Sequence, residues 1–328
     1  MSKVLFKTLD SLARLSLGIA LLWVLFQYAE INSKQVSIFF RYDLVFYAIL
    51  LKIMVVFLMS YRWMIVLRSN KIEQRLIDSF KFTLIGQSLM VVLPGVIAQD
   101  VSKVIGTIRS TNSSGQRGKI IALSIVDRLI GIVALLVSSI LLIVIYYLYE
   151  YMMSGFTAHY GLLNWVLFFC LTILFCLAFF YYAFNRIQDM KFSPKIIINL
   201  LSRVAVLADY LYLIKNKDLL LYISILSHLF NAFLVVIIVN QLSTEIHVLV
   251  NVIFGLISNF GNFFPLTPGG LGITESVFMY LYSHIGYDLG LVIGLSYRFL
   301  SYTSIFILTA IFISSMYVYN TKQVLKNN

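Results

Sequence analysis

Long apolar stretches separated by short polar connections account for most of this chain. Six of them have roughly the 17–25 apolar residues, or more, that cross a bilayer core as a helix. They lie at residues 15–29, 44–61, 120–149, 161–184, 218–241 and 289–317. The pattern therefore predicts an all-α, polytopic membrane protein with about six full spans.

Two further apolar stretches, residues 80–109 and 248–286, are interrupted by proline and glycine, so each arm is short for a full span. The residues at the breaks are Pro94, Gly95, Pro265, Pro268, Gly269, Gly270 and Gly272. Broken backbone at membrane depth is tolerated only where it is buried in protein or lines a wet cavity, and transporters aim such helix ends at polar substrates. We therefore expect two re-entrant Pro-Gly hairpins that flank the functional site.

The two halves of the chain have the same order of elements. Residues 1–149 hold two spans, a hairpin and a third span, and residues 150–317 repeat this order. Because each half has an odd number of crossings, the second half must start from the opposite side of the membrane. This predicts an inverted-topology repeat, followed by a cytoplasmic tail at 318–328.

Composition and charge agree with a membrane protein whose orientation is set by its loops. The chain is 60% hydrophobic and 12% charged, with a formal net charge of +11. Most of its lysines and arginines fall in 1–14, 62–81, 103–119, 186–217 and 322–326, whereas 150–160, 242–247 and 286–288 have none. This bias predicts a cytoplasmic-membrane protein with both termini cytoplasmic, and only Lys34 and Arg41 oppose it. The charge thus reflects orientation and attraction to anionic lipids rather than nucleic-acid binding.

Several ionisable residues fall inside the apolar stretches, where they are costly unless paired or hydrated. Those within spans or hairpins are Lys52, Asp127, Arg128, Glu275 and Arg298, with Asp100 and Lys103 at the edge and Arg62 just after the second span. Asp127 and Arg128 are about 100° apart on a helix, so they cannot face the same partner.

Two interpretations of these charges remain open. In the first, Asp100 with Arg128 and Glu275 with Arg298 are structural ion pairs that hold the hairpins. In the second, the two arginines receive a lipid phosphate, which suits the planar guanidinium, while the acids tune and release it. A pair that opens to accept phosphate would satisfy both.

The sequence shows no pattern for a metal, a cofactor or a hydrolytic triad. The four histidines are scattered over different segments, and the glycines at 269–272 lack the Lys-Ser/Thr of a phosphate loop. We therefore expect neither metal nor cofactor.

A set of short motifs then links the chain to a known family. They are Arg62-Trp63, Gln87, Leu93-Pro94-Gly95 followed by Asp100 and Lys103, Asp127-Arg128-Leu129-Ile130-Gly131, Pro268-Gly269-Gly270-Leu271-Gly272 with Glu275, and Tyr297-Arg298. In this order they resemble the lysylphosphatidylglycerol synthase transmembrane region, also called the flippase-like family, over nearly the whole chain. Ala98-Gln99 stands where relatives usually have Gly-Gly, and Lys103 where an arginine is common, which leaves the substrate open.

The resemblance implies movement of polar lipids between leaflets. Aminoacylating members carry a catalytic domain after the membrane region, and this chain ends at Asn328, so aminoacyl transfer is not expected. The leading hypothesis is a transporter, rather than an enzyme, for an anionic lipid, either a phospholipid or a polyprenyl-phosphate-linked sugar. The alternatives are an integral-membrane glycosyltransferase, or an accessory partner of a glycosyltransferase in surface polysaccharide or glycolipid assembly.

The charge bias generates a prediction about topology. In a variant whose two native cysteines are replaced by serine, Ser154→Cys should react with an impermeant thiol reagent in intact cells and Asn216→Cys should be protected. The opposite labelling pattern would invert the predicted orientation.

Overall fold

The computed structural model describes residues 41–92, 97–111, 114–154, 209–242, 245–263 and 267–327, together with Ser16, Ala20, Trp23, Val24 and Leu207. The expected spans 15–29 and 161–184 lie essentially outside these residues. All regular secondary structure in the described part of the chain is helical. The predicted all-α class is therefore confirmed there.

Four long helices correspond to four of the expected spans. They are α3 (Tyr42–Ser69), α6 (Arg117–Ser154), α9 (Lys217–Gln241) and α12 (Gly290–Asn327). Each contains a stretch long and apolar enough to cross a membrane. The protein is thus a membrane protein with several apolar helices.

Two of these helices extend well beyond the apolar stretches that predicted them. α3 continues to Ser69, so Arg62, which follows the apolar stretch in the sequence, lies inside the helix and is only 4% exposed. α12 continues through the expected tail to Asn327, because no proline or glycine follows residue 317 to end it. Hydropathy measures contact with lipid, whereas a helix ends only where its backbone hydrogen bonds end.

Each expected hairpin consists of two shorter helices. The first contains α4 (Leu76–Val92) and α5 (Ile97–Ser110), and the second contains α10 (Val248–Asn259) and α11 (Ile273–His284). Short 3-10 turns at Phe260–Phe263 and Pro268–Gly270 lie between the last two. Pro94, Gly95 and Pro265 lie outside the described residues, and re-entry into the membrane stays a prediction.

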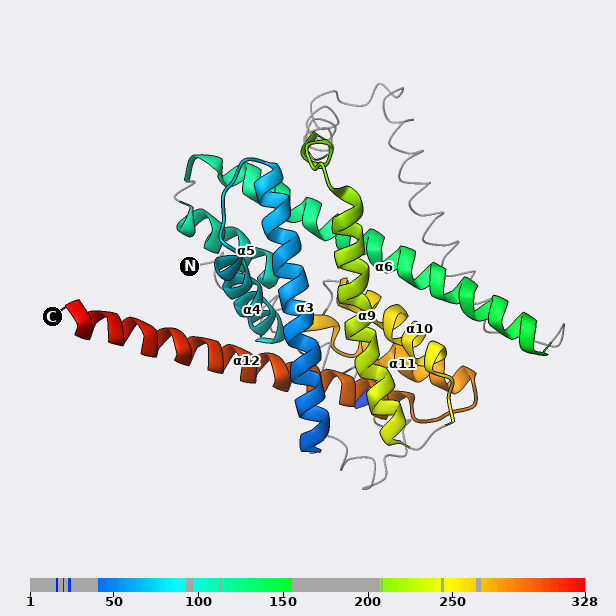
Figure 1. Ribbon diagram of the computed structural model, residues 1–328. Helices are drawn as coiled ribbons and strands as arrows, with labels where there is room; N and C mark the ends of the chain where they lie inside the picture. The colour runs from blue at the N-terminus through cyan, green and yellow to red at the C-terminus, as the bar shows by residue number, and fades with distance from the viewer. Residues whose placement is uncertain are drawn as a thin grey trace.

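Helices α3 and α9 run side by side in opposite directions through the centre of the molecule (Figure 1). Arg41, which precedes α3, donates from Nη1 to Gln241 at the end of α9 over 2.5 Å. Arg62, near the other end of α3, donates from Nη1 to Ser224 near the start of α9 over 2.9 Å. The chain direction therefore reverses between corresponding helices of the two halves, as an inverted repeat requires.

Two further sets of contacts between the halves are reciprocal. α12 of the second half packs on α3 and α4 of the first, and α6 of the first half packs on α9 and α10 of the second (Figure 1). Each long third helix thus covers the partner half. This arrangement supports the predicted repeat.

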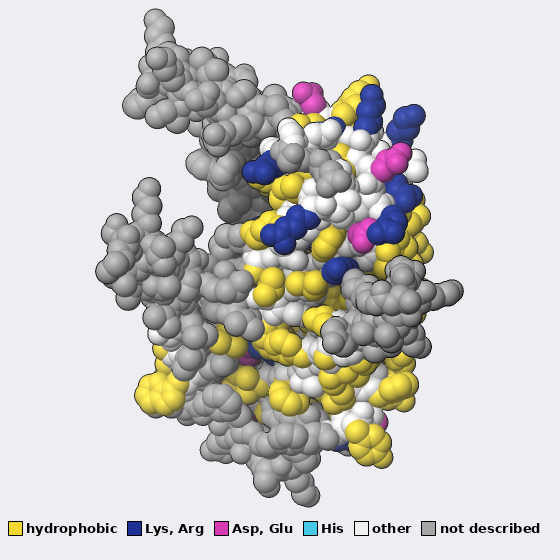
Figure 2. Space-filling model, turned by 90° about the vertical axis from the view of Figure 1, so that its left-hand side faces the viewer, with side chains coloured by type: hydrophobic (Ala, Val, Ile, Leu, Met, Phe, Trp, Pro, Cys, Tyr) yellow, Lys and Arg dark blue, Asp and Glu magenta, His cyan; other side chains and the backbone are white. Residues whose placement is uncertain are grey.

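The basic connections gather at one end of the molecule, which we call the basic end: residues 69–76, 110–111, 114–117 and 209–217. Lys119 donates from Nζ to the Asn70 carbonyl over 2.6 Å, and Ile214 packs in one cluster with Trp63 and Ile120. Figure 2 shows lysine and arginine side chains at this end above a mainly hydrophobic surface. At the opposite end, the rings of Tyr149 and His247 lie 5.2 Å apart. The loops therefore separate as the positive-inside pattern predicts, and which end faces the cytoplasm stays a prediction.

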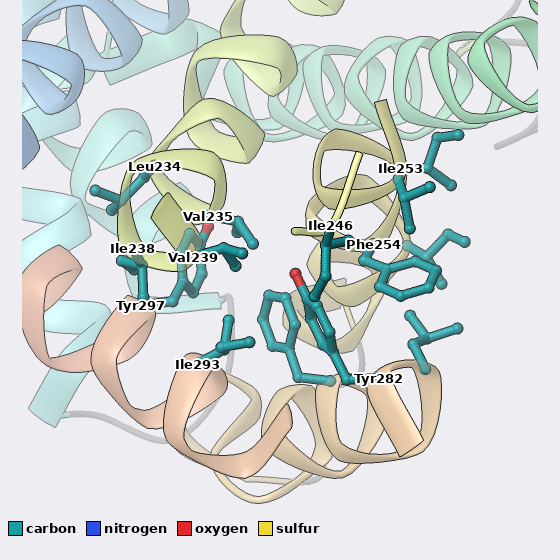
Figure 3. Packing of buried hydrophobic residues seen from close by; sticks show 14 of the residues in the cluster. Leu234, Val235, Ile238, Val239, Ile246, Ile253, Phe254, Tyr282, Ile293 and Tyr297 are labelled. Carbon is teal, nitrogen blue, oxygen red and sulfur yellow. The ribbon is translucent and has the colours of Figure 1, made fainter. Parts of the chain in front are cut away.

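The largest apolar cluster joins α9, α10, α11 and α12 (Figure 3). In it the rings of Phe254 and Tyr282 meet edge to face at 5.0 Å, and the Tyr282 hydroxyl donates to Asn251 Oδ1 over 2.7 Å. Tyr297 belongs to the same cluster and also lines the cavity described below. This packing fixes α12 relative to α9.

Glycine permits the close contact between α4 and α5, which suggests a paired test. A Cβ at Gly86 would lie 2.9 Å from the Gln99 carbonyl oxygen, whereas one at Gly118 would meet nothing within 4 Å. Gly86→Ala should therefore destabilise the protein by about 1–3 kcal/mol through overpacking. Gly118→Ala should be neutral or stabilising by up to about 1 kcal/mol. Melting curves of the two purified variants check this, and equal effects would show that α4 and α5 do not need the small residue.

Candidate functional site

A cavity of about 160 Å³ lies between the two halves, lined by α3, α4, α5, α6, α9, α12, the end of α10 and the break that follows it. It collects most of the residues that the sequence singled out: Arg62, Asp100, Lys103, Asp127, Arg128 and Arg298. Glu275 contacts one of them, Arg298, from α11. Residues far apart in sequence thus meet at a single polar site inside an apolar helix bundle.

The most buried charges form a three-residue cluster around Asp127. Arg62 donates from Nε and Nη2 to the two carboxylate oxygens over 2.7 and 3.1 Å, and Lys103 donates from Nζ over 2.9 Å. All three residues are at most 4% exposed. Lys103 is therefore fully buried within the protein, and its place at the edge of the membrane stays a prediction. Two cations share one carboxylate, so the cluster carries one excess positive charge.

Local sequence makes room for this cluster. A Cβ at residue 131 would lie 3.2 Å from Arg62 Nη1, so Gly131, one helical turn after Asp127, lets the arginine reach across. The Gly131 carbonyl accepts a hydrogen bond from His228 Nε2 on α9 over 3.0 Å. The Asp127-Arg128-Leu129-Ile130-Gly131 motif thus packs one helix against two others.

Arg128 faces away from Asp127, as the helical spacing predicted, and pairs with Asp100 instead. The contact is a single one, from Nη2 to Oδ2 at 3.0 Å, and the two side chains are 30% and 22% exposed. Although Arg128 Nη2 is within ion-pair distance of Asp100, the two atoms are not oriented for a hydrogen bond, and Nη2 forms no other. This ion pair is open to the cavity and loosely held.

Arg298 is held very differently. Its Nε and Nη2 donate to the two oxygens of Glu275, the latter over 3.1 Å, and its remaining N–H groups donate to the Gly269 carbonyl, the Gly270 carbonyl and the Tyr302 hydroxyl over 2.7, 2.9 and 2.6 Å. An arginine has five N–H donors, so every one is used. The geometry favours the structural interpretation for this arginine.

The Pro-Gly-Gly break supplies the carbonyls that hold Arg298. Gly269, Gly270 and Gly272 have φ values of 56°, 73° and 83°, a left-handed conformation that favours glycine. Glu275 also accepts from the Gly272 backbone N–H over 2.8 Å and so caps α11. The break, the cap and the arginine therefore form one rigid unit.

The two acid–arginine pairs occupy corresponding places in the two halves. Asp100 and Glu275 both lie in the first turn of the second hairpin helix, and each arginine lies on the long helix that follows. One pair is saturated and buried, and the other is exposed and incompletely bonded. The halves therefore share a plan but differ in how completely the arginine of each pair is bonded.

Lys52 is an intramembrane charge to which the sequence pattern assigned no role, and the polar residues of α9 were not predicted to belong to the site. Lys52 lines the cavity, is 7% exposed, and donates from Nζ to Asn231 Oδ1 over 2.6 Å. His228 and Asn231 are polar residues three positions apart in an apolar helix, which puts them on one face. That spacing is the sequence pattern from which a polar face of α9 at the site could have been predicted.

Amide side chains add unpaired donors to the cavity wall. Gln99 Nε2 and Asn259 Nδ2 are buried without a hydrogen-bond partner, and both residues line the cavity. Buried donors of this kind are costly unless a ligand or water accepts from them.

Overall, cations outnumber carboxylates at this site. Among the described residues, the site contains five cations and three carboxylates. The cations are Lys52, Arg62, Lys103, Arg128 and Arg298, and the carboxylates are Asp100, Asp127 and Glu275. Formally, two positive charges lack a counter-charge, one in the Asp127 cluster and one at Lys52. Within the same part of the chain, no group of three or more His, Cys, Asp or Glu residues could hold a metal ion.

Comparison with known proteins matches residues 11–309 to the family model described as the lysylphosphatidylglycerol synthase TM region. The matched stretch includes every residue that lines the cavity. No curated protein and no solved structure matched the chain.

The difference between the two pairs generates a stability prediction. Glu275→Gln leaves the buried guanidinium of Arg298 without its counter-charge, which should cost roughly 3–5 kcal/mol. Asp100→Asn changes a partly exposed pair and should cost about 0–1 kcal/mol. The measurement is the melting temperature and yield of each purified variant, and equal losses would contradict the assignment of one rigid and one open pair.

Proposed function

This chain belongs to the lysylphosphatidylglycerol synthase transmembrane-region family, a membrane domain associated with flippase-like handling of lipids, and we propose that it moves an anionic lipid between the leaflets of the cytoplasmic membrane. The cargo carries a phosphate headgroup, on either a phospholipid or a polyprenyl-phosphate-linked sugar. Membrane lipids are thus its proposed partners.

The charge excess in the cavity is the observation that carries this proposal. Unneutralised cations in a membrane interior are costly, and they mark pathways for ions and substrates. An anionic headgroup would supply the missing negative charge and accept from the unpaired amide donors. A neutral headgroup would leave the charge uncompensated.

Arg128 is the proposed first contact for the phosphate. Its guanidinium makes one contact to Asp100 and has incompletely used donors, so a phosphate could replace the carboxylate with bidentate geometry. Asp100 would then compete for the arginine and release the headgroup. Arg298 serves as a fixed anchor for the second break rather than as a phosphate ligand.

The paired helices suggest how the site is reached. We propose that α4 with α5 and α10 with α11 are re-entrant hairpins, one from each side of the membrane, with their breaks at the cavity. In transporters built this way, one repeat rocks against the other around a fixed site between them. The contact between α3 and α9 would be the axis of that movement.

The test is leaflet reversal of fluorescent phosphatidylglycerol in proteoliposomes, followed by quenching from outside. The wild-type chain should expose the inner-leaflet label faster than protein-free vesicles do. Arg128→Gln should slow reversal roughly ten- to a hundredfold, the range for losing one charged hydrogen bond. Arg75→Gln removes an arginine that is 81% exposed and outside the cavity, and it should leave the rate unchanged.

Two results would overturn the proposal. One is a wild-type rate for anionic lipids, including a polyprenyl phosphate, equal to that of empty vesicles. The other is transfer of sugar from an activated donor by the same preparation without leaflet reversal, which would favour the glycosyltransferase alternative.

A further inference from the structure

Lys52 is a buried cation without a counter-ion in the described part of the chain. Its ammonium group donates to Asn231 and lies 5.7 Å from the centre of the Tyr297 ring. The other four cations at the cavity each contact a carboxylate, whereas no described carboxylate lies within 4.0 Å of this one. Ammonium groups in an apolar interior normally require such a partner.

The position of Lys52 along α3 places it near the middle of the membrane. It lies ten residues after the helix begins, or about 15 Å at 1.5 Å per residue, which is half of a hydrocarbon core of about 30 Å. Asn231 lies ten residues before the end of the antiparallel α9, at the same depth. Arg62 lies a further ten residues, about 15 Å, toward the basic end. The two uncompensated charges are therefore at different depths.

The groups around Lys52 are prepared to donate hydrogen bonds. An ammonium group has three donors, and Asn231 accepts one of them. The side-chain oxygen of Asn259, Oδ1, accepts from the Tyr297 hydroxyl over 2.9 Å and from Asn262 Nδ2 over 3.3 Å, which orients the side-chain amide. Its Nδ2 is left buried and unpaired on the wall of the same cavity. Free donors and a free positive charge are the chemistry of an oxyanion site.

We propose that Lys52 and Asn259, with Asn231 as the group that positions the lysine, form a second binding station for a phosphoryl group at mid-membrane depth. The headgroup reaches it after leaving Arg128, and the order of the two stations rests on the proposed function. The binding chemistry of the station does not, because it depends only on the local charge and donors. Lys52 is thus the residue that selects for a negative headgroup at the middle of the path.

The experiment measures ligand-dependent thermal stabilisation of the purified full chain, since a ligand that binds only the folded state raises its stability with concentration. The probes are dioctanoylphosphatidylglycerol, uncharged dioctanoylglycerol and inorganic phosphate. The anionic lipid should raise the melting temperature of the wild-type chain, and the uncharged lipid should not. A rise with inorganic phosphate equal to that with the lipid would identify free phosphate as the source of the phosphoryl group.

The variants are Lys52→Gln and Lys52→Met, with Lys119→Gln as the control. Each Lys52 change should weaken binding of the anionic lipid roughly ten- to a hundredfold, as expected for a lost charged hydrogen bond. Without ligand, both should melt at or above the wild-type temperature, because an uncompensated buried charge has been removed. Lys119 donates to a backbone carbonyl outside the cavity, so its loss should leave the ligand-dependent shift intact.

Different results would overturn the Lys52 station and the transport function. Lys52 variants that bind the anionic lipid as tightly as the wild type overturn the station, even if the wild-type chain reverses lipids. A lower melting temperature of both variants without ligand, with an unchanged ligand-dependent shift, would make Lys52 a structural group and also overturn it. A wild-type chain that binds the anion through Lys52 but reverses no lipid retains the station and removes the transport proposal.

Discussion

An ionised side chain in an apolar bundle must find a counter-charge, and this requirement determines how the helices of this protein meet. Asp127 on α6 holds Arg62 from α3 and Lys103 from α5, so one carboxylate joins three helices. Arg62 also reaches Ser224 on α9, which ties this cluster to the other half of the chain. Without that network, the cavity between the halves would have no fixed wall at the basic end.

Each half pairs an arginine with an acid next to a helix break, but the two arginines differ in how many of their donors are bonded. In the second half, a carboxylate, two glycine carbonyls and a tyrosine hydroxyl use every donor of Arg298. In the first half, Arg128 makes one contact to a partly exposed Asp100. A repeat in which one pair is rigid and its counterpart is open has a built-in asymmetry. One side of the cavity therefore has a fully bonded arginine and the other a partly exposed one, and Lys52 lines the same cavity and contacts Asn231 on α9.

Sequence patterns located much of this arrangement. The acid after each break and the arginine on the next span indicated the pairs Asp100 with Arg128 and Glu275 with Arg298, and both pairs are present. Four spans lie where hydropathy placed them, because an apolar face toward lipid is visible in composition alone. The partners of Asp127 were not foreseen, since they come from two other helices and no spacing rule connects them.

The sequence by itself determined the class of the protein, the sites of the helix breaks and the residues that bear charge in the membrane, because each depends on local composition. Only the tertiary structure decided which of those charges are neutralised. That outcome depends on distances between helices far apart in the chain: Lys52 meets an amide on α9 rather than a carboxylate, and Arg298 meets the carbonyls of its own half. A charge excess is a sum over such contacts, so it exists only once the helices are packed.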